Sequence, residues 1–179
     1  ALSLDRGHDA PLGGVEPLPI VEPQPTPTDA GAWFGDVRQF CNPVEVDTHV
    51  RLDPAPATPE GKMHEAACYA LAGRIDRARE LIQGLAPDLR YQAAGVVFEA
   101  GHPAADAGDD IAAGPLMELV VEYWPNHYMA LYHAGAARYD LGDYDAARGY
   151  LESFMVEYAT EDGWRTSARG MLERIDGAR

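Results

Sequence analysis

A repeat with a period near 34 residues is the feature that most constrains how this chain can fold. Three segments share a glycine that is followed five residues later by an alanine. The glycines are Gly73, Gly108 and Gly142, and the alanines are Ala78, Ala113 and Ala147. Steps of 35 and then 34 residues are typical of stacked helix–turn–helix units. The glycine permits the positive φ of the turn, and the alanine lies where two helices cross closely. The repeat therefore predicts an all-α fold.

The three segments resemble the tetratricopeptide repeat (TPR) family. In the last copy, residues 128–158, the family's packing positions hold Leu131, Ala134, Gly135, Gly142, Tyr144, Ala147, Leu151 and Phe154. The middle copy keeps Gly101, Gly108, Ala113, Met117, Val120 and Trp124, and the first keeps Ala66, Tyr69, Gly73, Ala78, Ile82 and Leu85. Residues 160–175 are typical of a closing helix with one apolar side. The resemblance covers about residues 59–175 and implies about three TPR-like helix–turn–helix repeats with a C-terminal capping helix.

The middle copy departs from this pattern at two prolines. Gly101-His102-Pro103 is expected to break the first helix of that copy, because proline lacks an N–H and its ring clashes with the preceding turn. Pro115 is expected to kink or delay the second helix.

The chain divides near residue 57 into two regions of different composition. Residues 1–57 contain nine of the fourteen prolines, which predicts an extended proline-rich arm. Thr58 and Pro59 suit the N-cap and first position of a helix, so residues 58–179 are predicted to form the repeat domain.

The arm carries apolar residues that predict docking. Val44, Val46, Val50 and Leu52 alternate with polar residues, which predicts one half-buried β-strand. Trp33, Phe34 and Phe40 lie just upstream and are too many aromatic residues for a simple linker. These seven residues are the predicted docking surface of the arm, either on its own domain or on another chain.

The two cysteines allow two interpretations. The chain starts at Ala1 without an initiator Met, which favours an exported protein, periplasmic or at the cell surface. In that setting Cys41 and Cys68 are expected to form a disulfide that ties the arm to the domain. The alternative is two free buried thiols that behave as small apolar groups.

The charge of the chain excludes several kinds of partner. Its 179 residues carry a net charge of −15, and 46% of them are hydrophobic, which is enough to build a core. Such acidity argues against binding to nucleic acid or to anionic lipid surfaces. No apolar run is long enough for direct membrane insertion.

The sequence offers no convincing catalytic, cofactor-binding or metal-binding residues. His64 and Cys68 have the spacing of a zinc helix but lack a third ligand nearby. The aspartates around the second and third repeat glycines are interpreted as helix caps. No serine lies in a nucleophile motif and no glycine-rich phosphate loop is present, so no enzyme and no cofactor is predicted.

The TPR resemblance implies a protein-binding groove along the first helix of each pair. In the last copy its residues would be Met129, Tyr132, His133, Ala136, Tyr139 and Asp140. The family's carboxylate clamp uses Lys, Arg and Asn here, so a role in binding acidic C-terminal peptides is not expected. A tyrosine-lined acidic groove suits proline-rich or basic extended ligands, unless these tyrosines only pack between repeats.

Two functions follow from this interpretation. The first is an exported, non-enzymatic TPR adaptor or accessory subunit whose groove binds a partner protein, as an extended peptide or a neighbouring subunit. The second is a structural subunit in which the arm of one copy docks on the next copy, forming a homo-oligomer such as a filament or ring.

Overall fold

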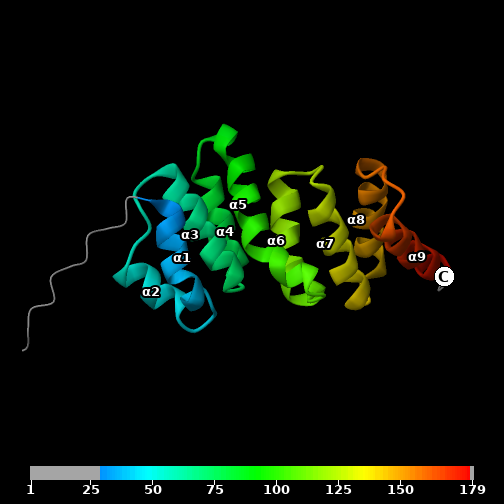
Figure 1. Ribbon diagram of the computed structural model, residues 1–179, viewed down its shortest axis with the longest axis horizontal. Helices are drawn as coiled ribbons and strands as arrows, with labels where there is room; N and C mark the ends of the chain where they lie inside the picture. Colours follow the sequence, from blue (N-terminus) through cyan, green and yellow to red (C-terminus); the bar gives the residue numbers. More distant parts are fainter. Residues whose placement is uncertain (1–28, 178–179) are drawn as a thin grey trace, which may run out of the picture.

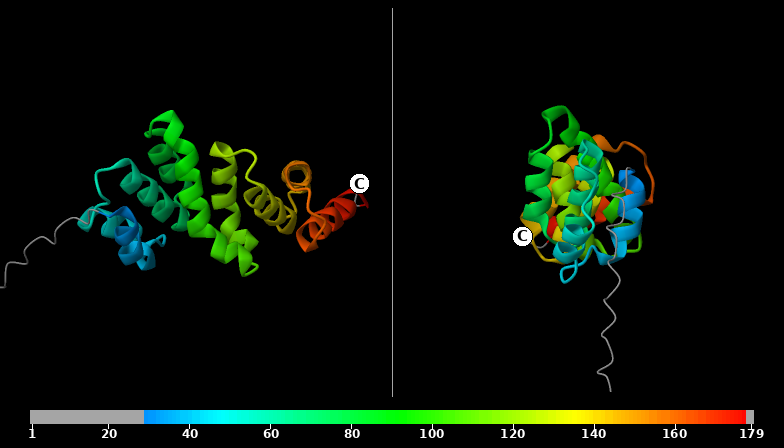
Figure 2. Two further views of the ribbon diagram at one scale, coloured as in Figure 1. Left: turned by 45° about the horizontal axis from the view of Figure 1, so that its top comes forward. Right: turned by 90° about the vertical axis from the view of Figure 1, so that its left-hand side faces the viewer.

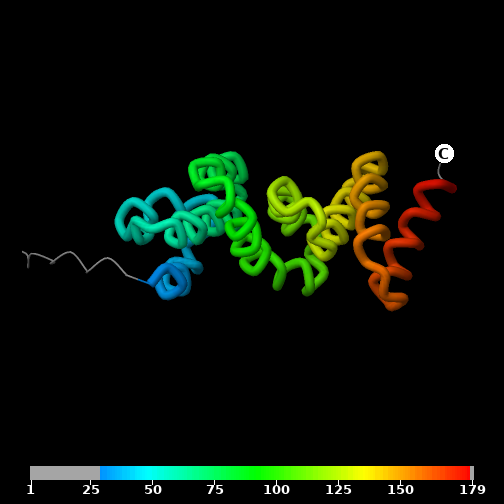
Figure 3. The backbone as a smooth tube through the Cα atoms, turned by 90° about the horizontal axis from the view of Figure 1, so that it is seen from above, coloured from blue at the N-terminus to red at the C-terminus, as the bar shows by residue number. Residues whose placement is uncertain are grey.

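The protein is a row of helices arranged along one long axis (Figure 1). The computed structural model describes residues 29–177, and these form nine α-helices and one short 3-10 helix without any strand. They are α1 (Ala30–Val37), η1 (Arg38–Phe40), α2 (Val46–Leu52), α3 (Pro59–Leu71), α4 (Ile75–Gln83), α5 (Pro87–Asp106), α6 (Asp110–Tyr123), α7 (Tyr128–Asp140), α8 (Tyr144–Glu157) and α9 (Gly163–Gly177). The predicted all-α class is confirmed. Turned views show a narrow, elongated body with α1 near one end and α9 at the other (Figures 2 and 3).

The three repeat glycines occupy equivalent turns between helices. Gly73, Gly108 and Gly142 have φ values of 70°, 87° and 76°, a region where a side chain would be strained. Each glycine N–H donates to the carbonyl three residues before it, and the next residue's N–H donates to the carbonyl five residues before it. This is the hydrogen-bond pattern of a glycine C-cap, repeated at the ends of α3, α5 and α7.

Small residues allow the paired helices to approach each other. The three repeat alanines are at most 2% exposed. A Cβ added to Gly101 in α5 would lie 2.8 Å from Leu116 Cδ2 in α6, and one added to Gly135 in α7 would lie 2.7 Å from Leu151 Cγ in α8. The 34-residue period therefore repeats close helix crossings as well as turns.

The region before α3 differs from the sequence prediction. Residues 44–52 do not form a strand: α2 covers most of them, and α1 and η1 precede it, so residues 30–40 and 46–52 are helical rather than part of an extended arm. The side chain of Asn42 accepts the N–H groups of Val44 and Glu45, which closes the turn that leads into α2. The proline-rich residues 1–28 of the predicted arm lie outside the described residues.

The predicted docking residues of this region divide into three groups. Trp33 and Val46 are fully buried, and Val50 is 8% exposed. Phe34 and Phe40 are half-buried. The last two, Val44 and Leu52, are 87% and 72% exposed. Because the buried ones belong to the same core as α3 and α5, this part of the chain docks on its own domain.

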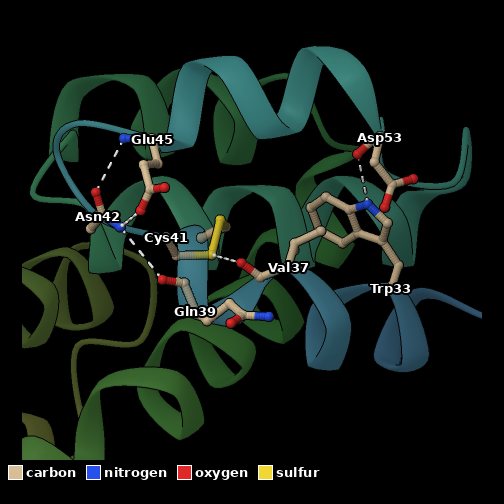
Figure 4. Close-up of a disulfide and its surroundings, with 8 residues drawn as sticks. Trp33, Val37, Gln39, Cys41, Asn42, Glu45 and Asp53 are labelled. Atoms are coloured by element: carbon tan, nitrogen blue, oxygen red, sulfur yellow. Dashed lines mark hydrogen bonds between the residues drawn. A yellow bond between two sulfur atoms is a disulfide. The ribbon is translucent and has the colours of Figure 1, made fainter.

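A disulfide joins this N-terminal region to α3. Cys41 follows η1 and Cys68 lies in α3, and their sulfur atoms are bonded (Figure 4). Next to it, Trp33 Nε1 donates a 2.9 Å hydrogen bond to the carbonyl of Asp53, beyond the end of α2. The bridge also removes Cys68 from any zinc pair with His64, whose ring instead packs against Phe34.

Both prolines of the middle repeat lie inside helices, so the prediction that 101–103 breaks its helix is wrong. Pro103 lies in the last turn of α5 and removes only its own N–H donor; its carbonyl still accepts the N–H of Ala107, and α5 continues through it to its end. Pro115 lies within α6, which begins directly after the turn. The delay expected at Pro115 is therefore also absent.

Charged pairs join neighbouring helices on the surface. Arg79 in α4 donates from Nε to both carboxylate oxygens of Glu122 in α6, and Arg138 in α7 donates two hydrogen bonds to Glu118 in α6.

Two buried clusters together run from Trp33 in α1 to Ile175 in α9. Within residues 29–177, no helix is long and apolar enough to cross a membrane.

Candidate functional site

A strip of contacting aromatic and histidine rings runs over α5, α7, α8 and α9 and the residues that follow α6 and α8. We call this the ring strip. It consists of Tyr91, Phe98, His102, Trp124, His127, Tyr128, Tyr132, His133, Phe154, Tyr158 and Trp164. Neighbouring rings along it have centroids between 4.1 and 6.2 Å apart. The strip therefore forms one continuous series of ring contacts, in which the rings of Phe98, Tyr132, His133 and Phe154 are buried.

Part of the ring strip is open to a ligand. Tyr91 and Tyr128 are 49% and 42% exposed, and Trp124 and Trp164 are half-buried. Tyr91, near the start of α5, packs its ring 4.1 Å from that of Trp124, which follows α6. The exposed rings are held by neighbouring rings, so they present flat apolar faces in fixed positions.

The predicted groove residues of α7 do not all reach the surface. Tyr132, His133 and Ala136 are buried, and Tyr132 donates a hydrogen bond from its hydroxyl to Ser167 Oγ in α9 at 3.0 Å. Burial raises the pKa of Tyr132. The alternative in which the tyrosines pack between repeats therefore describes Tyr132.

The remaining predicted groove residues lie nearer the solvent. Met129 and Tyr139 are half-buried and Asp140 is exposed. Tyr139 accepts a 2.8 Å hydrogen bond from Arg174 Nε in α9 and lies under the guanidinium of that arginine. A ligand passing along α7 would meet these three side chains.

His127, a member of the ring strip, caps the start of α7. Its Nδ1 accepts the N–H of Ala130 at 3.2 Å, so the imidazole acts as the N-cap of the helix. Burial lowers the pKa of this imidazole, since it disfavours the charged form.

Two histidines and two aspartates meet where α5, α6 and α7 come together. His133 Nδ1 lies 2.7 Å from Asp110 Oδ1, and His102 Nε2 lies 3.2 Å from Asp106 Oδ1. The two imidazole rings are 5.5 Å apart, edge to face. His133 is 1% exposed, whereas the side chains of His102 and Asp106 are 26% and 52% exposed. The cluster thus has a buried side and an open side.

The capping interpretation of the turn aspartates holds for only some of them. Asp109 and Asp143 accept N–H groups at the starts of α6 and α8, as expected. Asp106 and Asp110, however, face histidines. Asp106 faces His102, four residues earlier on α5, and Asp110 faces His133, which is distant in sequence. No local signal brings the pair on α5 to His133 and Asp110, because that meeting depends on how α6 packs against both α5 and α7.

The N-terminal helix covers the neighbouring part of the same surface. Arg38 donates a hydrogen bond to the carbonyl of Ala100 in α5 at 3.0 Å, and Phe34 packs on His64 of α3. A cleft of about 370 Å³ remains between α1, α3 and α5, lined by Gln92 and Glu99 among others. The part of this surface that a ligand can reach therefore lies between α1 and α9.

The chain matches no model of a known protein family, and neither the curated proteins nor the solved structures contain a match to it.

Proposed function

We propose that this protein is an exported TPR-type adaptor, a non-enzymatic module that binds an extended segment of a partner protein along the ring strip. The observation that carries this proposal is the set of partly exposed rings held in place by neighbouring rings, such as Tyr91 by Trp124 and Tyr128 by Tyr158. Rigid aromatic faces stack well on proline rings and on the guanidinium of arginine.

The charge of the chain narrows the class of ligand. The net charge is −15, and Glu99 and Asp140 lie exposed on the helices that carry the strip. An acidic partner segment would be repelled, whereas a basic or neutral proline-rich segment would be attracted or tolerated. The proposed ligand is therefore an extended proline-rich or basic segment.

Two features support an adaptor in an oxidising compartment. Residues 30–52 pack on their own domain, so this part of the N-terminal region is not free to dock on a neighbouring copy. The Cys41–Cys68 disulfide is of a kind that persists outside the reducing cytosol.

Defined peptides test the proposal directly. The full chain is titrated with fluorescent proline-rich, arginine-rich and acidic peptides of equal length, and binding is followed by anisotropy. We expect saturable binding of proline-rich or arginine-rich peptides and none of acidic peptides. Binding of arginine-rich peptides should weaken as salt is raised.

A matched pair of tyrosines supplies the control. Tyr128 and Tyr144 are the first residues of α7 and α8 and are 42% and 43% exposed, but only Tyr128 belongs to the ring strip. Tyr128→Ala should weaken peptide binding by about tenfold, in the range of a lost aromatic contact, while Tyr144→Ala, whose ring contacts Tyr139 outside the strip, should have a clearly smaller effect. Equal effects of the two substitutions would count against the ring strip as the binding surface.

Self-assembly remains the second candidate, because two apolar side chains near the N-terminal end are exposed. Val44 and Leu52, 87% and 72% exposed, could contact a second copy. Light scattering on the full chain, on a chain that begins at Asp29 and on a Val44→Ser/Leu52→Ser variant separates the possibilities. Oligomers of the full chain that are lost in either altered chain would favour assembly, and monomers throughout would favour the adaptor.

A further inference from the structure

The cluster at the meeting point of α5, α6 and α7 contains the donor set of a transition-metal site. His102, Asp106 and His133 each offer one ligand atom, and these three atoms all lie within 4.8 Å of one another. His102 and Asp106 are one turn apart near the C-terminal end of α5, and His133 comes from the middle of α7. Two imidazoles and a carboxylate are a ligand combination that zinc uses when one position stays open.

His133 is oriented as a metal ligand would be. Its Nδ1 lies 2.7 Å from Asp110 Oδ1, so the Nδ1–H donates to the carboxylate and the lone pair is on Nε2. Metal-bound histidines commonly donate their second N–H to a carboxylate, which fixes the tautomer and the direction of the ring. Asp110 itself is the first residue of α6, where the helix dipole stabilises its negative charge.

The two Nε2 atoms are buried without a hydrogen-bond partner among the described residues. This holds for both His102 and His133. Asp106 Oδ1 approaches His102 Nε2 to 3.2 Å without forming a hydrogen bond. A buried ring nitrogen without a partner is destabilising, and here two such nitrogens belong to rings 5.5 Å apart. Water could satisfy them, but a cation would satisfy both nitrogens and the carboxylate together.

We propose that His102, His133 and Asp106 bind a divalent transition metal of the zinc class, with Asp110 as the carboxylate that orients His133. The charges balance, since two neutral imidazoles and two carboxylates meet a doubly charged ion. The site lies within the ring strip, but it does not depend on the proposed peptide binding.

The separations require only a small adjustment. Ligand atoms around a tetrahedral zinc ion lie about 3.3 Å apart, given bonds of about 2.0–2.2 Å. The contact between His102 and Asp106 is already 3.2 Å. Closing a separation of up to 4.8 Å calls for a side-chain shift of about 1.5 Å, which the partly exposed His102 and Asp106 can make. The buried His133 can stay in place.

Metal titration of the full chain tests the site. The protein is treated with EDTA, exchanged into metal-free buffer and titrated with Zn²⁺ by calorimetry and with Co²⁺ by visible absorption. We expect one Zn²⁺ per chain and a Co²⁺ spectrum of low coordination number that Zn²⁺ abolishes. Failure of the unaltered chain to bind either ion overturns the proposal.

Substitutions at the partly exposed ligands locate the ion, with another histidine as control. His102→Gln and Asp106→Asn should weaken Zn²⁺ binding by more than the roughly 10–100-fold that loss of an orienting carboxylate costs. His64→Gln removes a histidine of α3 outside the cluster and should leave the Zn²⁺ affinity unchanged. Binding that survives both ligand substitutions would place the ion elsewhere and refute the assignment.

Asp110→Asn and nitrogen NMR examine the orienting role. Asp110→Asn should weaken binding by roughly 10–100-fold without changing the stoichiometry. In ¹⁵N-histidine spectra, Zn²⁺ should shift Nε2 of His102 and His133 while Nδ1 of His133 stays protonated. A shift of Nδ1 instead would contradict the proposed geometry. Peptide binding measured with and without Zn²⁺ reports on the adaptor proposal separately.

Discussion

Replacing Gly135 by alanine should destabilise the protein, although alanine favours helices. Gly135 lies in the interior of α7, and a Cβ there would meet Leu151 Cγ at 2.7 Å, its Cδ2 at 2.8 Å and its backbone N at 3.3 Å. Ordinary carbon–carbon contacts are about 3.5–4.0 Å, so α7 and α8 must separate or Leu151 must leave its rotamer. Leu151 is fully buried, which leaves it little space to move.

Gly149 in α8 is the matched control for this substitution. It is also inside a helix, but an added Cβ meets nothing within 4 Å. Both Gly→Ala changes gain about 1 kcal/mol of helix propensity. Overpacking at Gly135 costs about 1–3 kcal/mol. The difference between the two variants isolates the clash, so Gly135→Ala should be about 1–3 kcal/mol less stable than Gly149→Ala.

Urea unfolding followed by far-UV circular dichroism measures both variants. In heat unfolding, each kcal/mol lost from the free energy of unfolding lowers the Tm by about 2–4 °C for a chain of this size. Adding Leu151→Ala to both the parent and Gly135→Ala should show a favourable coupling in the double-mutant cycle, because the smaller side chain removes the clash. Equal stabilities for Gly135→Ala and Gly149→Ala would refute close packing of α7 on α8 at this position.

Three further predictions concern the disulfide and two titrating groups. Replacing Cys41 and Cys68 together by alanine should lower the free energy of unfolding by about 3–4 kcal/mol, as expected for a bridge spanning 27 residues. A loss below about 1 kcal/mol in urea unfolding would show that packing alone anchors α1 and α2. Because burial lowers the pKa of His127, stability should fall as pH drops below its ordinary value of about 6.5. His127→Asn, which keeps a capping side chain, should flatten this dependence in unfolding curves between pH 5 and 8, and an unchanged slope would exclude His127 as its source. Burial chiefly raises the pKa of Glu65, so its contribution to stability is lost as pH rises through and above about 4.3. Glu65→Gln should therefore be more stabilising at pH 7 than at pH 4, and a difference that does not depend on pH would contradict this.

Local sequence signals predicted the repeat part of the fold. Gly73 and its two equivalents mark turns that need positive φ, and this requirement depends on the backbone alone. Thr58 caps α3 by accepting the N–H of Gly61, another interaction within one turn of chain. Helix boundaries of this kind can be predicted because nearest neighbours decide them.

The prediction of a strand at residues 44–52 was wrong because the same apolar pattern is compatible with a strand and with a helix. Val46 and Val50 are four residues apart. That spacing places them on one face of a strand, where side chains alternate, and also on one face of a helix. The turn built by Asn42 and the burial of both valines against the core select the helix. The break expected at Pro103 also failed to appear, because the proline removes only its own N–H donor and α5 continues through it.

The sequence by itself determined the all-α class, the positions of the three glycine turns and the small residues at the helix crossings. Each of these follows from backbone geometry or from the size of one side chain. Only the tertiary structure decided which rings contact one another and that His102, Asp106 and His133 meet. His133 comes from α7 and the other two from α5, and their separation depends on how α6 packs against both helices, which no local pattern encodes.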